Sequence, residues 1–164
     1  MVRKGRGFTL IEILVVIGLI AILAAVVIIA INPARQFAQG RNSQRTSNTG
    51  SILNAIGQNI ADNKGVFNCA APGAVIDGTV RKIEYAATTT AGSSDLRPCI
   101  VPAYMSEIPY DPSYNASAGH VASSTDYNTE YTITQDTTTQ RITICAPGGV
   151  EPAVPGSTAI CVSR

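Results

Sequence analysis

One acidic side chain, Glu12, stands near the start of a long apolar run, where a charge is energetically costly. The run from Ile13 to Ile31 contains no charged and no polar side chain. A carboxylate in this position can snorkel to the membrane interface, or it can pair with a cation that offsets the cost of burial. A cut between Gly7 and Phe8 would create such a cation, because the new Phe8 amine would lie about one helical turn from Glu12. We therefore expect Glu12 to pair with the amine of a neighbouring copy and to fix the register between two helices.

Cysteines are the second group of residues whose side chains could do chemistry. They stand at positions 69, 99, 145 and 161, with spacings of 30, 46 and 16 residues. No C-x-x-C pair is present, so the spacing does not favour a zinc site. Two disulfides in an oxidising compartment fit the pattern, and four free thiols in a reducing compartment are the alternative. Of the three possible pairings we prefer Cys69–Cys99 with Cys145–Cys161, because each bond closes a short local loop.

The remaining residue types give little support to catalysis. His120 is the single histidine and stands in a loop-like stretch, where we expect a surface side chain. Nucleophilic catalysis usually needs a base beside the nucleophile, and no such arrangement is evident. The P-loop pattern is missing, so any ATP-driven step belongs to another protein. We expect no enzyme, no cofactor and no metal; calcium at Asp111, Asp126 and Asp136 is a minor hypothesis, because these acids lack EF-hand spacing.

Charge gives the chain no overall attraction to polyanions. It has 12 basic and 11 acidic side chains, a net charge of +1. Removal of residues 1–7 would take away three basic side chains and leave 9 against 11, a net charge of −2. DNA binding is therefore not indicated. Arg35, Arg41 and Arg45 have no aromatic residues interleaved with them, so we expect a solvated or intersubunit face there.

The apolar run predicts a membrane-spanning helix. Phe8 to Ile31 comprises 24 residues, and a helix of that length spans about 36 Å, enough for a hydrocarbon core of about 30 Å. The run is longer than the apolar region of a cleaved secretory signal. Three basic residues precede the run and three follow it, so their distribution does not decide the topology. The cysteines favour a head outside the cytoplasm and an N-terminus inside it.

Beyond the apolar run the pattern becomes amphipathic and then alternating. Pro33 predicts a kink over residues 29–32, or else the start of a second helix. Apolar residues at positions 52, 56 and 60 predict a helix that ends near Asp62. Alternation predicts strands at 79–85, 130–134, 140–145 and 159–162, with a hairpin connection at 136–139. We therefore expect an α+β fold, in which a small antiparallel sheet of three or four strands packs on the second half of a long N-terminal helix.

Two stretches resemble a known family. Residues 7–36, GFTLIEILVVIGLIAILAAVVIIAINPARQ, resemble the N-terminal methylation motif of type IV pilins and type II secretion pseudopilins. In that family a prepilin peptidase cuts after a glycine and methylates the new phenylalanine amine. The resemblance implies cleavage after Gly7, N-methylation of Phe8, a role in assembly for Glu12 and a type IV pilin-like fold. Residues 104–112, YMSEIPYDP, resemble a stretch seen in many pseudopilins and small bacterial pilins.

The resemblance also implies a division of the chain. We expect a leader peptide at 1–7, a transmembrane and filament-core helix at 8–31, an amphipathic helix half at 32–62 and an extracytoplasmic head at 63–164. The expected product is a pilin that passes from the inner membrane into a surface filament used for adhesion, motility or DNA uptake.

Its expected partners are further copies of itself, the prepilin peptidase, an inner-membrane platform protein, an assembly ATPase, minor pilins and, before assembly, membrane lipid. One alternative is a pseudopilin of a type II secretion or competence system. Another is a membrane-anchored binding domain that does not assemble, which would keep its N-terminus and tolerate Glu12→Ala.

Overall fold

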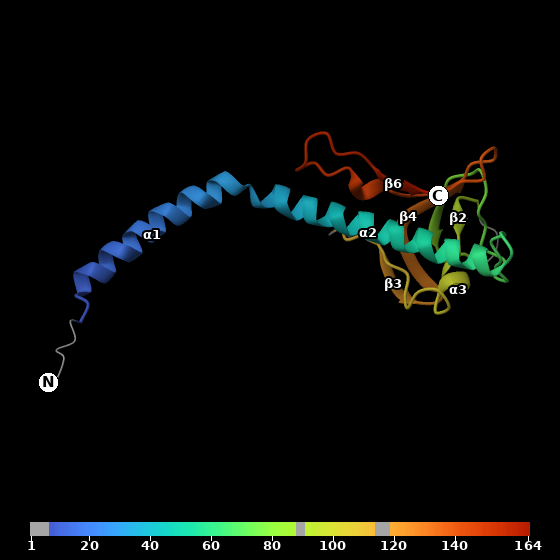
Figure 1. Ribbon diagram of the computed structural model, residues 1–164, viewed down its shortest axis with the longest axis horizontal. Coiled ribbons are helices and arrows are strands. Elements are labelled where there is room, and N and C mark those ends of the chain that lie inside the picture. Colours follow the sequence, from blue (N-terminus) through green and yellow to red (C-terminus); the bar gives the residue numbers. More distant parts are fainter. Residues whose placement is uncertain (1–6, 88–90, 114–118) are drawn as a thin grey trace. The chain divides into compact units, whose positions relative to one another are not determined.

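The computed structural model describes residues 7–87, 91–113 and 119–164 (Figure 1). The chain divides into two compact units, Met1–Phe37 and Ala38–Arg164. Each unit has its own architecture and is described separately.

The first unit is built around α1 (Leu10–Ile31). Thr9 is its N-cap, with φ −83° and ψ 152°, and the described side chains of the helix are exposed from Leu10 to Ile28. This stretch is long and apolar enough to cross a membrane. The helix ends before Asn32, whose φ of 47° is left-handed, and Pro33 is the first residue of α2 (Pro33–Asp62). Proline is tolerated at this first position, because its missing N–H would have no helical partner there.

In the second unit, α2 buries one face. Ile52, Leu53 and Ile56 are buried on this face, as the helical spacing of the apolar residues predicts. The helix ends at Asp62, where Lys64 and Gly65 have positive φ and the Gly65 N–H donates to the Ile60 carbonyl at 2.8 Å. Glycine takes up this left-handed conformation without steric cost, so it suits the end of a helix.

A mixed sheet forms the other layer of the second unit. Its strands among the described residues are β1 (Arg81–Glu84), β2 (Ser93–Ser94), β3 (His120–Ser123), β4 (Asp126–Gln135), β5 (Ile142–Ala146) and β6 (Ile160–Ser163). They follow the order β2-β1-β4-β5-β6, and β3 pairs with β4 off this path. A short helix, α3 (Arg97–Ile100), and a 3₁₀ turn, η1 (Pro147–Gly149), connect the strands.

The α+β class expected from the sequence is confirmed. The sheet, however, has more strands than the three or four expected, and it is not purely antiparallel. The described sheet has six strands, and β1 pairs with β2 in parallel. β2 is two residues long, and β3 is a short, largely exposed strand without apolar alternation. Such strands are specified by their pairing partners, so a search for periodic apolar residues passes over them.

The core lies between α2 and the sheet. It joins Ile52 and Ile56 of the helix to Ile83, Tyr131 and Ile144 of the strands. β5 alternates buried and half-buried residues along its length, so one face of this strand points inward and the other outward.

Two disulfides tie the second unit together. Cys69–Cys99 has a Cα–Cα distance of 5.2 Å and adjoins the core. Cys145–Cys161 joins directly opposed residues of β5 and β6, whose Cα atoms are 4.1 Å apart. Each bond closes a loop and so reduces the conformational entropy of the unfolded chain.

Candidate processing and assembly site

The Gly7–Phe8 junction lies just outside α1. Neither residue is helical, and Phe8 is 85% exposed. A Cβ atom added to Gly7 would meet no described atom within 4 Å. The described fold therefore does not itself require glycine at position 7.

Glu12 has an internal partner, which is Thr9. The Thr9 N–H and the Thr9 hydroxyl each donate to Glu12 Oε2 at 2.8 Å, while the Glu12 N–H donates to Thr9 Oγ1 at 3.3 Å. This reciprocal arrangement is a capping box, which satisfies backbone donors that the first helical turn leaves free. Thr9 is a functional residue that was not among the sequence-based expectations, although the spacing Thr-x-x-Glu is the signal of a capping box.

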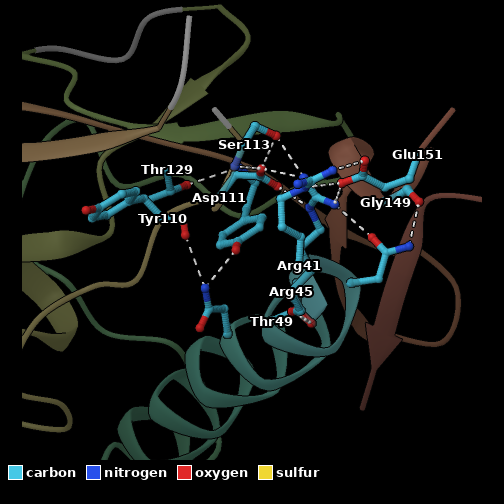
Figure 2. A network of polar contacts seen from close by, with 12 residues as sticks. Arg41, Arg45, Thr49, Tyr110, Asp111, Ser113, Thr129, Gly149 and Glu151 are labelled. Carbon is cyan, nitrogen blue, oxygen red and sulfur yellow. Dashed lines mark hydrogen bonds and ion pairs between the residues drawn. The ribbon is translucent and has the colours of Figure 1, made fainter. Parts of the chain in front are cut away.

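A second concentration of polar side chains lies in the head, where α2 meets two loops (Figure 2). Arg45 is at its centre, with a side chain only 1% exposed. Its Nε and Nη2 donate to the two carboxylate oxygens of Asp111 at 2.7 and 2.8 Å, and its Nη1 donates to Glu151 Oε1 at 2.6 Å. The expectation of a solvated or intersubunit Arg45 was therefore wrong. A guanidinium can be buried in this way when carboxylates occupy its donors.

Arg41 extends this network toward the surface. It donates to both oxygens of Glu151, at 2.7 and 2.6 Å, and its side chain is 31% exposed. One turn of α2 thus supplies two arginines, and two loops supply two carboxylates, so the formal charges cancel. Asn42 adds a hydrogen bond to the Gly149 carbonyl at 3.1 Å. The network attaches the loop after β5 to the helix.

The network holds both carboxylates in their charged form. Hydrogen bonds from Arg41, against the opposing effect of burial, lower the pKa of Glu151 to about 2, and Arg45 contributes in the same direction. Burial alone would raise the pKa of Asp111, but hydrogen bonds from Arg45 and Ser113 outweigh it and lower that pKa. Ionised carboxylates of this kind accept strong, charge-assisted hydrogen bonds.

Asp111 also fixes the segment 104–112 against the sheet. Its backbone N–H donates to the Thr129 carbonyl at 2.9 Å, next to Glu130, whose φ of 59° marks an irregularity in β4. Asn48 of α2 donates to the Tyr110 carbonyl at 3.1 Å and to the Tyr131 hydroxyl at 2.9 Å. These contacts give the YMSEIPYDP stretch a structural role, which is to hold α2 against β4.

The other residues singled out by the sequence lie apart from one another. His120 contacts Asp126 at 3.0 Å between Nε2 and Oδ1. Asp136 accepts hydrogen bonds from the backbone N–H groups of Thr138 and Thr139 in the β4–β5 turn. The three aspartates considered for calcium thus have separate partners. Within the described ranges, no three His, Cys, Asp or Glu side chains gather in a group suited to a metal.

Comparison with known proteins connects the N-terminal features to a family. The family described as the prokaryotic N-terminal methylation motif matches residues 2–30, which include Gly7, Phe8 and Glu12. No curated protein and no solved structure matches the chain. The matched signature is one of structural pilin-type proteins, not of enzymes, and it suits a membrane-anchored precursor. The chain therefore carries, at residues 2–30, the methylation motif that is the signature of type IV pilins and pseudopilins.

Proposed function

We propose that the chain is a structural subunit of a type IV pilus. A prepilin peptidase removes residues 1–7 and methylates the Phe8 amine, after which the subunit polymerises into a helical surface filament. The observation that carries this proposal is the methylation motif, placed on a helix whose described apolar side chains are all exposed. Within one chain this apolar surface has no partner among the described residues, so it calls for lipid or for other copies.

Assembly would exchange one apolar environment for another. The precursor rests in the inner membrane with α1 in lipid, the N-terminus in the cytoplasm and the head outside. In the filament, the α1 helices of successive subunits replace the lipid. Glu12 pairs with the Phe8 amine of a neighbour, which converts a costly charge into a contact that sets the register. A head-to-tail contact that does not close on itself extends into a helical filament.

The proposal requires further proteins that the chain cannot replace. Cleavage and methylation need the prepilin peptidase. Extrusion from the membrane needs an assembly ATPase and an inner-membrane platform protein, because this sequence has no P-loop motif. Minor pilins complete the filament, and the disulfide-bonded head forms its outer surface, where it makes the contacts of adhesion, motility or DNA uptake.

A pseudopilin of a type II secretion or competence system is the second candidate. The observation that favours it is the 104–112 stretch, which resembles pseudopilins as well as small pilins. A pseudopilin would pass through the same cleavage and methylation, but it would form a short fibre that stays within the envelope. A membrane-anchored domain that does not assemble is the remaining alternative, and it predicts an intact N-terminus.

Mass spectrometry of the N-terminal peptide would test the proposal. Sheared surface material and membranes would be compared for the wild type, Gly7→Val and Glu12→Ala. We expect methylated Phe8 at the N-terminus in the sheared fraction of the wild type. A Cβ atom at position 7 meets no described atom within 4 Å, so Gly7→Val should leave the described fold intact. An uncut chain in that variant would therefore show that the peptidase requires glycine at this position. Glu12→Ala should be cut but missing from the sheared fraction.

The distribution of the peptide separates the candidates. A cut and methylated peptide found only in membranes would favour the pseudopilin. An intact Met1 in every fraction of the wild type would refute processing and leave the non-assembling membrane domain.

A further inference from the structure

We propose that Thr9 is a positioning residue, which holds the Glu12 carboxylate so that its two oxygens have separate roles. Oε2 caps the subunit's own helix, and Oε1 is left to receive the amine of the neighbouring subunit. This inference rests on the proposed filament function and adds a second residue to its assembly contact.

The hydrogen bonds around Glu12 are unevenly distributed. Both donors of Thr9, its N–H and its hydroxyl, converge on Oε2 at 2.8 Å. No residue in the described ranges donates to Oε1. A carboxylate offers about four acceptor positions over its two oxygens, so the contact with Thr9 leaves an entire oxygen for another donor.

The Thr9 hydroxyl acts in both directions. It donates to Glu12 Oε2 and accepts from the Glu12 N–H at 3.3 Å. The Thr9 hydroxyl therefore holds both the carboxylate of Glu12 and its backbone N–H. A long acidic side chain normally loses rotamer freedom when it forms an ion pair. Here the capping box has already restricted it, so pairing with an incoming amine costs less entropy.

The same contact serves the apolar surroundings of the filament. Away from water, unsatisfied N–H groups at the start of a helix are costly. Thr9 and Glu12 satisfy each other's N–H groups. If Glu12 turned both oxygens toward a neighbour's amine, the Thr9 N–H would lose its acceptor. One oxygen for each task keeps both the cap and the contact between subunits.

Three substitutions separate capping from positioning. Thr9→Ser keeps the donor and the acceptor. Thr9→Val has nearly the same shape and loses both. Thr9→Asp keeps a good helix cap but, when ionised, cannot donate to Glu12.

Each full-length variant would be expressed together with the wild-type chain, and the N-terminal peptides, which differ in mass, would be quantified. The measured quantity is the ratio of processed variant to processed wild type in the sheared fraction, divided by the same ratio in membranes. This quotient removes differences in expression and in cleavage.

We expect the quotient for Thr9→Val to fall about fivefold, the factor that corresponds to the net loss of one hydrogen bond to the Glu12 carboxylate. Thr9→Ser should stay within about twofold of unity, and Thr9→Asp should fall with Thr9→Val because the donor is lost.

Several results would overturn the inference. A quotient near unity for Thr9→Val would mean that the hydroxyl is not needed for assembly. A quotient near unity for Thr9→Asp would mean that the cap alone matters. Failure of Thr9→Val to be cut would place the role of Thr9 at the peptidase instead. Absence of the wild-type peptide from the sheared fraction would refute the filament function itself, and the inference with it.

Discussion

Arg45 shows how one buried cation can hold three parts of the head together. It comes from α2 and binds Asp111 of one loop and Glu151 of another, at sequence separations of 66 and 106 residues. If Arg45 were removed, Asp111 would be left as a buried charge without its cation, and Glu151 would keep only Arg41. The cost of breaking such a group therefore exceeds the net benefit of forming it.

Arg45→Met keeps the length of the side chain and removes its charge. We expect the free energy of unfolding to fall by about 3–5 kcal/mol, because Asp111 loses its bidentate partner. Arg141→Met is the matched control, since Arg141 is exposed on the β4–β5 hairpin, and its effect should stay within about 0.5 kcal/mol. Urea unfolding of the purified chain, followed by far-ultraviolet circular dichroism, would measure both. Equal effects of the two substitutions would contradict the structural role of Arg45.

Glu151 makes the stability of the head depend on pH in the acid range. Its folded-state pKa of about 2 lies below the usual value of 4.5. A lowered pKa means that the folded state binds the proton less readily than the unfolded state. Its contribution to stability is therefore fully present above about pH 4.5 and is lost as the pH falls toward 2.

Glu151→Gln should flatten the fall in stability between pH 4.5 and 2. Asp77→Asn is a useful comparison, because Arg81 also lowers the pKa of Asp77 to about 2, but its side chain is 40% exposed. Solvent screens an exposed pair, so this variant should flatten the curve less. Urea midpoints measured across this pH range would test the order. A wild-type curve without acid dependence, or the reverse order, would be inconsistent with the network.

At the scale of elements, the helices and strands that could be predicted are those with a recognisable pattern of residue types over a short stretch of sequence. The N-terminal motif is contiguous from Gly7 to Glu12 and could be identified from residue types alone. The amphipathic half of α2 and the β4–β5 hairpin follow from spacing, because one face of each is buried. β2 and β3 could not be found in this way, since β2 has only two residues and β3 is largely exposed, so neither shows an alternation of apolar and polar residues. The burial of Arg45 could not be predicted from local patterns, because its carboxylate partners lie 66 and 106 residues away.

The two disulfides should differ in their contribution to stability. Cys145 and Cys161 are 16 residues apart, whereas Cys69 and Cys99 are 30 apart, and Cys99 is also part of the core. A longer closed loop loses more entropy in the unfolded state. We expect replacement of the Cys145–Cys161 pair by serines to cost about 3 kcal/mol, and replacement of the Cys69–Cys99 pair to cost more.

Urea midpoints of the two double variants would establish this order. Peptide mapping without reduction would check that each variant retains the other bond. Mixed pairings in the wild type, or a larger cost for the Cys145–Cys161 pair, would contradict the arrangement seen here.

At the scale of the whole molecule, the two units differ in where their apolar side chains lie. The first unit exposes the described apolar side chains of α1, with Leu10 81% and Ile22 66% exposed. The second unit holds every residue of the core cluster, together with both disulfides and the arginine network. The division into units falls at Phe37 and Ala38, a few residues before Arg41. The apolar helix is thus dispensable for the core, whereas the segment that carries Arg41 and Arg45 is not.

A chain that begins at Ala38 should therefore fold on its own. We expect residues 38–164 to be monomeric without detergent, to form both disulfides and to unfold in one cooperative transition, because the truncation removes exposed apolar surface and no core residue. A chain that begins at Ser47 is the matched control. It loses both Arg41 and Arg45, leaves Asp111 and Glu151 buried without their partners, and should be less stable by about 3 kcal/mol or more. Analytical ultracentrifugation and urea unfolding of the two chains would compare them. Aggregation of residues 38–164 would show that the head needs α1 to fold, and equal stability of the two chains would show that the arginines do not hold the loops on α2.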